Sequence, residues 1–362
     1  MASLLKLGAT IALARLQLQA ANAHYNIDPN YRIDVHSHPI PDVWRQALIE
    51  TGHPIVNGTL FNEGFPVPDW TLTGHIENMD SYGVNYSTLS ITTPGVYFLA
   101  KTPKKMKRLA RQLNNIMYEY TQAHPTRLGA LCVLPLPSVK DALAEIEYCL
   151  DTLEFDGIGL YTNFDGLYLG DARLDPIFAE LNKRNATVFV HPATPGCADA
   201  TLGYGGPLTE YPFDSVRAME NMLLTGQRAR YPNVSMIYPH GGGAMPYLAG
   251  RIAGVASLDA LGALNPATVI AQLKGYYFDT ASAYSAIQLQ ALKAFSGVGK
   301  LVTGTDFPYV PENQAKPGLA SIQTNGNFTD AEMAQINNQN ALSIFPRIAT
   351  KLGLSDPCDI VG

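Results

Sequence analysis

The chain has 362 residues, of which 46% are hydrophobic and 15% charged, and its formal net charge is −6. This length exceeds most single domains but suits one (β/α)8 barrel, which needs about 250 residues or more. A negative net charge without a long basic run excludes a nucleic-acid-binding surface, whereas small acidic substrates stay possible because a local metal cation outweighs the overall field.

The first 23 residues are typical of a signal peptide. Lys6 precedes an apolar stretch over residues 7–14, and Ala21-Asn22-Ala23 follows as a cleavage site of the A-x-A type. Arg15 cuts the apolar stretch short, so residence in the cytosol is the alternative. We expect residues 1–23 to direct the chain into the secretory pathway and residues 24–362 to form one mature barrel domain.

From residue 31 onward, short apolar segments alternate with helical patterns. Eight segments rich in β-branched or aromatic residues are expected strands, at residues 31–36, 85–92, 128–134, 157–161, 187–191, 234–240, 275–280 and 300–305. Expected helices between them include residues 104–123, 139–150, 175–184, 215–225 and 283–295. Eight such units predict an α/β fold, a single closed (β/α)8 TIM barrel. A doubly wound open sheet is the alternative, but no GxGxxG motif follows the first strand.

Two segments rich in proline and glycine interrupt this alternation. Residues 52–70 follow the first strand, and residues 308–317 follow the last. Both come after the carboxyl end of a strand, which is the face where barrels of this kind carry their active sites. We therefore expect the first of them to be an ordered loop that folds over the site, and the second to be a comparable loop.

Histidines and one aspartate gather at the ends of the expected strands. His36 and His38 close the first strand and point the same way, since residues i and i+2 of a strand share a face. His191 ends the fifth strand, His240 the sixth and Asp306 the eighth. Each alone has a simpler explanation, such as a core histidine or a helix N-cap. Together they predict a site for one divalent metal, most favourably Zn²⁺, with Mn²⁺, Fe²⁺ or Co²⁺ as alternatives.

These motifs resemble the amidohydrolase-related decarboxylases, the family of aminocarboxymuconate-semialdehyde decarboxylase and γ-resorcylate decarboxylase. The resemblance rests on residues 33–38 (IDVHSH), 127–136, 155–190, 190–192 (VHP), 239–242 (PHGG) and 304–308 (GTDFP), and it extends over residues 32–345. It implies that His36, His38, His191 and Asp306 are ligands of the metal. It also implies that His240 is a catalytic histidine outside the ligand set. The chemistry of the reaction allows either His240 or Asp306 to be catalytic in delivering the proton.

The resemblance implies a carbon–carbon lyase that removes CO2 from a small aromatic 2-hydroxy acid, and it is closest to the fungal 6-methylsalicylate decarboxylases. Conversion of 6-methylsalicylate to m-cresol is therefore the expected reaction, without an organic cofactor. Residues 155–163 contain no lysine, where binuclear amidohydrolases usually place a carboxylated lysine, so one metal ion is expected. The alternatives are a metal-dependent hydrolase of an amide, ester or lactone, and a non-catalytic secreted binding protein.

Candidate substrate contacts are Arg45, for a carboxylate, and Trp44 and Phe213, for the wall of an aromatic pocket. A solvated helix charge and core packing are the alternatives for these residues. Further candidates for the pocket wall are Phe65, Trp70 and Tyr97. The expected partner is thus a small aromatic carboxylic acid, and the resemblance implies a homodimer or homotetramer.

Cysteines and glycosylation motifs complete the sequence evidence. Cys132, Cys149, Cys197 and Cys358 form no CxxC pair, which argues against a zinc ribbon or a disulfide-dense scaffold. The first two lie in apolar runs and are expected to pack in the core. N-glycosylation sequons, which suit a secretory route, begin at Asn57, Asn85, Asn185, Asn233 and Asn327. No apolar stretch is long enough to span a bilayer.

Overall fold

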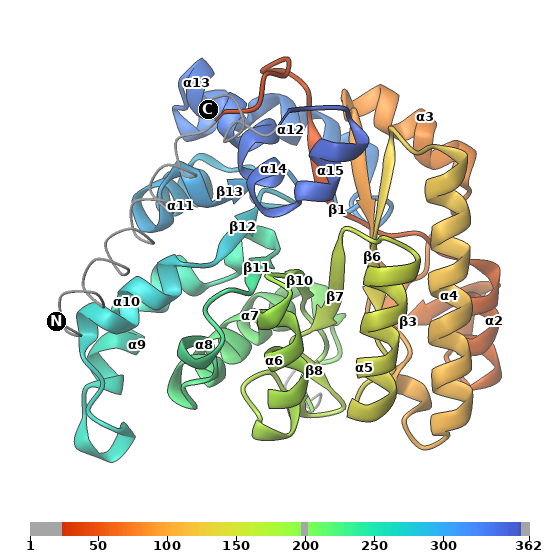
Figure 1. Cartoon of the computed structure of the whole chain (residues 1–362), viewed down its shortest axis with the longest axis horizontal. Coiled ribbons are helices and arrows are strands. Elements are labelled where there is room, and N and C mark those ends of the chain that lie inside the picture. The colour runs from red at the N-terminus through yellow and green to blue at the C-terminus, as the bar shows by residue number, and fades with distance from the viewer. Residues whose placement is uncertain (1–23, 197–201, 356–362) are drawn as a thin grey trace, which may run out of the picture.

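The computed structural model describes residues 24–196 and 202–355 and forms a closed barrel of parallel strands surrounded by helices (Figure 1). The strands are β1 (Ile33–Ser37), β5 (Tyr86–Leu89), β6 (Leu128–Val133), β7 (Gly157–Tyr161), β10 (Thr187–His191), β11 (Ser235–Tyr238), β12 (Tyr277–Asp279) and β13 (Leu301–Val302). Isolated bridges from Asp34 to Thr303 and from Ser37 to Phe307 join the first strand to the last. All eight expected strands and the TIM barrel are confirmed.

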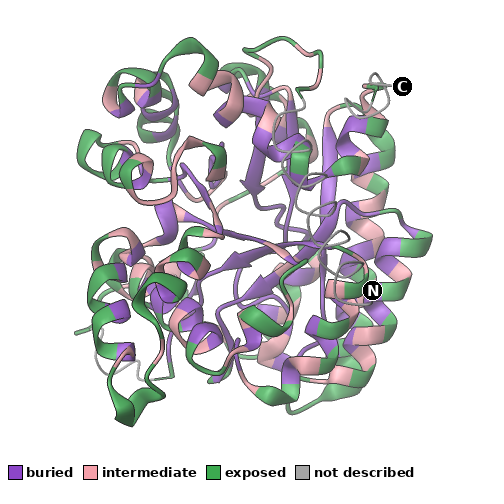
Figure 2. Cartoon of the chain, turned by 60° about the vertical axis from the view of Figure 1, so that its left-hand side comes forward, coloured by how far each residue is buried: buried purple, intermediate pink, exposed green. Residues whose placement is uncertain are grey.

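The strands are buried on both faces, which explains their near-continuous apolar sequences (Figure 2). Inside the barrel, Ile33, Leu131, Phe189 and Ile237 pack in one cluster with apolar residues of the last helices, among them Phe345. A second and larger apolar cluster lies between the strands and the surrounding helices. The interior of the barrel is therefore filled toward its amino end, and in barrels of this kind the active site lies at the carboxyl end.

The outer helices are α2 (Asp42–Glu50), α3 (Leu72–Tyr82), α4 (Pro103–Ala123), α5 (Val139–Glu147), α6 (Asp175–Lys183), α7 (Gly206–Leu224), α8 (Gln227–Arg230), α9 (Met245–Ala256), α10 (Pro266–Lys274), α11 (Ala286–Ser296), α12 (Glu312–Gly326), α13 (Asp330–Ala334), α14 (Asn340–Ile344) and α15 (Pro346–Lys351). Side-chain caps define several of their ends. Ser285 and Gln288 form a capping box at α11, and Thr71 caps α3, which ends at the left-handed Gly83. The five expected helices are all present.

Two boundaries differ from the expectation. Helix α7 begins at Gly206 instead of residue 215, and it contains Pro212 inside the helix, where proline normally predicts a break. Helix α12 begins at Glu312, so the loop expected over residues 308–317 ends at Pro311 and Pro317 is helical. Both prolines lie inside the helices, where proline usually breaks a helix, and this explains why the sequence predicts both starts too late.

The segment expected as a loop over residues 52–70 contains three short antiparallel strands, β2 (Ile55–Val56), β3 (Thr59–Asn62) and β4 (Phe65–Pro66). We call residues 55–66 the flap. Its strands were not predicted because β2 is exposed and only two residues long. A second small hairpin, β8 (Asn163–Phe164) and β9 (Leu167–Tyr168), follows β7.

Cys132 of β6 and Cys149, which follows α5, are fully buried in the core, as expected. They also form a disulfide, which the sequence did not predict because 17 positions separate the two cysteines. The expected signal peptide lies outside the described residues. Among the helices described, none has the length and apolar character needed to cross a bilayer.

Candidate metal centre

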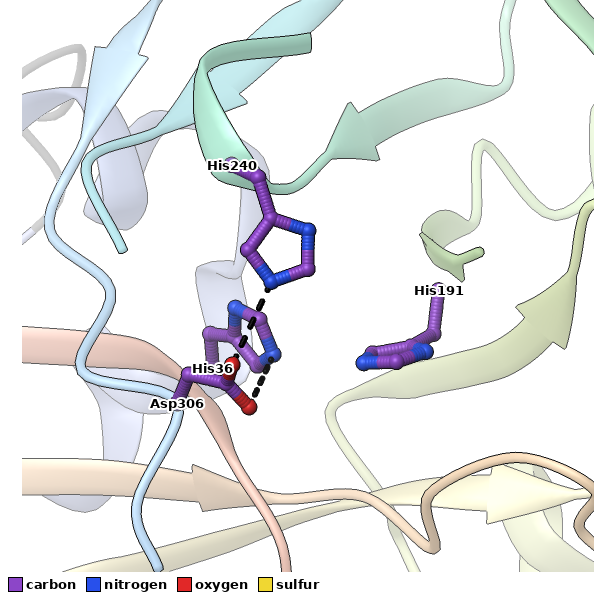
Figure 3. Close-up of side chains that lie close together, drawn as sticks. All are labelled: His36, His191, His240 and Asp306. Carbon is purple, nitrogen blue, oxygen red and sulfur yellow. Dashed lines mark hydrogen bonds and ion pairs between the residues drawn. The ribbon is translucent and has the colours of Figure 1, made fainter. Parts of the chain in front are cut away.

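Side chains from four different barrel segments converge at the carboxyl end of the barrel (Figure 3). The ligand atoms of His36, His191, His240 and Asp306 all lie within 4.8 Å of one another. His38 joins them, since its Nε2 is 3.0 Å from His36 Nε2. The structure thus brings together all five residues that the sequence placed at strand ends.

Hydrogen bonds fix the orientation of three of these imidazoles. The Nδ1 atom of His38 lies 2.9 Å from the carbonyl oxygen of Ser90, and that of His191 lies 2.7 Å from the carbonyl oxygen of Pro192. A carbonyl only accepts, so each Nδ1 carries the hydrogen and donates it. The Nε2 atoms of both rings therefore present bare lone pairs, the state in which histidine binds a metal.

Asp279 orients His36 in the same way. Its Oδ2 lies 2.7 Å from His36 Nδ1, and its Oδ1 accepts the backbone N–H groups of His240 and Ala281 at 2.9 and 3.0 Å. A carboxylate behind an imidazole is a common support for metal-binding histidines. Asp279 was not among the predicted site residues, although its position at the end of the seventh expected strand is a signal available in the sequence.

The spacing of the donor atoms fits a small divalent cation. Nε2 of His36 and Nε2 of His38 each lie 3.2 Å from Asp306 Oδ1 and 3.0 Å from one another. A proton on His36 Nε2 or a bound cation in its place accounts for these short separations, because bare lone pairs alone would repel each other. Donors held 2.0–2.1 Å from a tetrahedral ion are about 3.3 Å apart, which is close to these distances.

The charges around this point also favour a cation. Burial lowers the pKa of His36, but Asp306 and Asp279 outweigh it and raise that pKa to about 10. Burial opposes the charged form of Asp306, yet the charge on His36 and the hydrogen bonds from His240 and His36 hold its pKa well below the usual range. Burial keeps the pKa of His191 well below its ordinary value, so this ring is neutral and able to bind metal.

Asp34 ties the first strand to the segment that carries Asp306. Its carboxylate accepts the backbone N–H groups of His36 and Thr305, both at 3.0 Å, and the Thr305 hydroxyl at 2.7 Å. Burial raises the pKa of Asp34 to about 6, against the effect of these hydrogen bonds. No role was predicted for Asp34. Its position two residues before His36 places it on the same face of the first strand, and this is the signal that the sequence offers.

His240 is the most exposed of these imidazoles, and its ring lines a cavity. Its side chain is 15% exposed, and its Nε2 lies 3.3 Å from Asp306 Oδ2. The glycines that follow are required by the turn. A Cβ on Gly242 would lie 2.5 Å from Phe278, and one on Gly243 would lie 2.2 Å from the carbonyl oxygen of Pro212.

The cavity has a volume of about 610 Å³ and borders His191, His240 and Asp306. Its walls come from the flap, the loop after β5, the start of α7 and the loop after β13, with Asn62, Phe65, Thr93, Leu208, Tyr211, Tyr309 and Val310 among them. No lysine or arginine of the described residues lines it. Residues 197–201, which are not described, contain neither. The flap covers the site, as the sequence predicts for this segment.

The other substrate-contact candidates lie elsewhere, except Phe65. Arg45 donates to the carbonyl oxygen of Pro68 at 2.6 Å and is absent from the cavity lining. Trp44 is fully buried and donates to the carbonyl oxygen of Gly95, away from the cavity. Phe213 is 43% exposed and does not line the cavity either.

Trp70 packs on His75 and Tyr120, and Tyr97 lines a separate groove.

Comparison with known proteins identifies the relatives of this chain. The amidohydrolase family model matches residues 33–347. The chain is 34% identical to decarboxylase macB of Penicillium terrestre over 296 residues, which are 77% of this chain and 85% of that protein. It is 32% identical to 6-methylsalicylic acid decarboxylase of Penicillium expansum over 331 residues, 88% of this chain and 97% of that protein.

Solved structures share the fold. A crystal structure of an amidohydrolase II has a TM-score of 0.79 at 28% identity, and the match covers 88% of this chain and 99% of that chain. The manganese-bound dihydroxybenzoic acid decarboxylase of Polaromonas sp. JS666 has a TM-score of 0.71 at 19% identity, covering 88% and 97%. The second likeness concerns the fold alone.

Proposed function

The chain belongs to the amidohydrolase family, and on this basis we propose that it is a metal-dependent, non-oxidative decarboxylase of a small aromatic 2-hydroxy acid. The reaction we assign is the conversion of 6-methylsalicylate to m-cresol and CO2, the activity for which a relative over nearly the whole chain is named. The observation that carries the proposal is a set of imidazole nitrogens and one carboxylate at the edge of a cavity whose described lining contains no lysine or arginine.

We assign His36, His38, His191 and Asp306 as the ligands of one divalent metal. Imidazole and carboxylate donors at these spacings favour Zn²⁺, and Mn²⁺ is the alternative, supported by the manganese in a structural relative. When bound, such an ion acts as a Lewis acid on substrate oxygens. Asp279 and the carbonyl groups of Ser90 and Pro192 keep the imidazole rings in the metal-binding orientation.

The reaction needs a proton at the ring carbon that bears the carboxylate. Direct loss of CO2 would leave an aryl anion, whereas protonation of that carbon first lets the C–C bond break with recovery of the aromatic ring. His240 lines the cavity and reaches Asp306 at 3.3 Å, so we assign it as the group that gives the proton. Asp306 is placed to relay it. Overall, one proton replaces one CO2 on the ring.

The cavity suits an acid with a single carboxylate. Because no lysine or arginine lines it, a second carboxylate of the substrate would be desolvated without a counter-charge. Phe65, Leu208 and Val310 provide apolar wall for a ring and a methyl substituent. These features agree with 6-methylsalicylate, a monocarboxylate whose only other polar group is its hydroxyl.

A direct assay tests this function. Purified protein is analysed for bound Zn, Mn, Fe and Co and then incubated with 6-methylsalicylate, and products are followed by chromatography. We expect one divalent ion per chain and formation of m-cresol. Bound metal with no turnover of any 2-hydroxybenzoate, together with cleavage of an ester or lactone, would assign the chain to the hydrolases instead.

We further propose that the protein enters the secretory pathway and carries N-glycans. The Cys132–Cys149 disulfide supports this, since such bonds persist in oxidising compartments. Four of the five sequon asparagines are exposed, at Asn57, Asn185, Asn233 and Asn327. Asn85 is instead half-buried and accepts the backbone N–H of Arg32. Secretion from a eukaryotic host, with a mass shift on glycosidase treatment, is the expected result.

For the assembly we propose a homodimer or a homotetramer. The exposed apolar side chains of Phe213 and Tyr247, on α7 and α9, support association of copies. Light scattering coupled to size-exclusion chromatography measures the mass directly.

A further inference from the structure

Glu63 stands at the tip of the flap, between β3 and β4, and has no part in the metal centre. It occupies the left-handed region of the backbone, with φ at 49°, as the turn between two short strands requires. Its side chain is partly buried, and none of the described cationic side chains lies within ion-pair distance of it. The carboxylate therefore depends on neutral donors.

Those donors come from three separate parts of the barrel mouth. Oε1 accepts the hydroxyl groups of Thr93 and Tyr97, at 2.9 and 3.1 Å, from the loop after β5. Oε2 accepts the backbone N–H and the hydroxyl of Thr194 at 3.1 and 2.8 Å, and the hydroxyl of Tyr211 at 2.6 Å. One side chain thus joins the flap to the loops after β5 and β10 and to helix α7.

The backbone at the flap tip makes a close contact in the same place. The N–H of Gly206 donates to the carbonyl oxygen of Glu63 at 3.3 Å. A Cβ on Gly64 would lie 3.0 Å from Cα of Gly205, so the two chains approach as closely as glycines permit. Elsewhere the flap is held less firmly: Asn62 donates to the carbonyl oxygen of Thr93, while Ile55 and Val56 are exposed.

The residues that Glu63 holds are those that shape the cavity. Its neighbours Asn62 and Phe65 line the cavity, and so do its partners Thr93 and Tyr211. The ring of Tyr211 also packs edge-on against His191, with 5.8 Å between ring centroids. Movement of the flap tip would therefore displace one wall of the cavity and a neighbour of a proposed metal ligand.

We infer that Glu63 is a positioning residue, which fastens the flap to the barrel mouth and so sets the wall against which the substrate binds. The identity of the substrate in this inference rests on the proposed function, whereas the attachment of the flap to the barrel mouth by Glu63 does not depend on it. Glu63 touches neither the metal ligands nor the cavity interior, so its effect is on the shape of the site rather than on proton transfer.

The test compares Glu63→Ala and Glu63→Gln with Glu147→Ala, a control at an exposed position on α5. In Glu63→Ala we expect amide hydrogen exchange over residues 55–66 to rise at least about tenfold, and KM to rise about tenfold, because the cavity wall is no longer fixed. Metal content and kcat should change less than about threefold. Glu63→Gln keeps an acceptor and the side-chain shape, so it should restore KM to within about threefold of the wild type.

The two readouts separate the possible failures. Unchanged exchange over residues 55–66 in Glu63→Ala would overturn the fastening, and faster exchange with unchanged KM would overturn the role in the cavity wall. If the wild type decarboxylates no 2-hydroxybenzoate, the proposed function fails while the exchange data still decide the fastening. Should Glu63→Ala not fold, Tyr97→Phe removes one donor and must raise exchange and KM in the same direction.

Discussion

The Asp279 carboxylate and the His36 imidazole form a fully buried pair, with 2.7 Å between Oδ2 and Nδ1. The pair fixes which nitrogen of His36 faces the other donors. Because the second oxygen of Asp279 also holds the backbone N–H of His240, one residue outside the cavity supports both a proposed ligand and the proposed proton donor.

Replacing Asp279 tests this support. Asp279→Asn removes the charge and the preference for a hydrogen on His36 Nδ1, and we expect metal affinity to fall about 10- to 100-fold. Competition with a metal-sensitive chelator dye measures the change. Asp141→Asn, an acidic side chain on the outer helix α5, is the matched control. Equal affinities in both variants would refute the supporting role.

Removing the proton donor should separate catalysis from metal binding. In His240→Asn we expect kcat to fall about 10²- to 10⁴-fold, because a positioned acid is lost while the proposed ligands remain. Metal content by mass spectrometry should match that of the wild type. In His38→Ala, by contrast, both metal and activity should be lost. If kcat of His240→Asn stays within a few-fold of the wild-type value, Asp306 and not His240 delivers the proton.

Chelation should inactivate and destabilise the protein together. Stripping the ion removes the Lewis acid that the proposed reaction needs, so activity should vanish and return with Zn²⁺ or Mn²⁺. An ion present at 100 times its Kd stabilises the folded state by about 2.7 kcal/mol, which differential scanning fluorimetry detects as a higher Tm. Full activity after exhaustive dialysis against chelator would contradict the metal requirement.

Acid stability should depend on His75. This ring is 1% exposed and accepts the indole N–H of Trp70, and burial lowers its pKa to about 3. In the unfolded chain this histidine binds a proton near pH 6.5, whereas in the folded protein it does so only near pH 3. The stabilisation that depends on neutral His75 is therefore complete above about pH 6.5 and is lost as the pH falls toward 3. In His75→Phe the slope of unfolding free energy between pH 6 and 4 should decrease by up to about 1.4 kcal/mol per pH unit.

Urea unfolding at several pH values gives the slope of the unfolding free energy against pH for the wild type and for His75→Phe. The two proteins share all other titrating groups, so a difference between the slopes reports His75 alone. Parallel slopes would mean that His75 takes up its proton in the folded protein.

The disulfide has a separate effect on stability. A cross-link that closes a loop of 17 residues restricts the unfolded chain, and its loss in Cys132→Ala/Cys149→Ala should cost about 3 kcal/mol. Peptide mapping without reductant should recover the linked pair from secreted protein. Free thiols at both positions in that material would contradict the bond.

Elements with a strong local signal were predictable from the sequence. All eight strands are short buried apolar runs, and the histidines at their ends could be placed because parallel strands of a barrel end at one face. What the sequence left unassigned depends on partners far apart in the chain. Glu63 reaches Tyr211, 148 positions away, and Asp279 reaches His36, 243 positions away. The local sequence around a single acidic residue in a strand or a turn does not indicate which distant residues it will contact.

The bridge between Asp34 and Thr303 has a consequence for the order of events during synthesis. Because the first strand pairs with the last, the segment bearing Asp306 must leave the ribosome before the ring of strands can close. The proposed donor set is therefore complete only after this pairing, and binding of a metal ion at the site would report closure of the ring of strands.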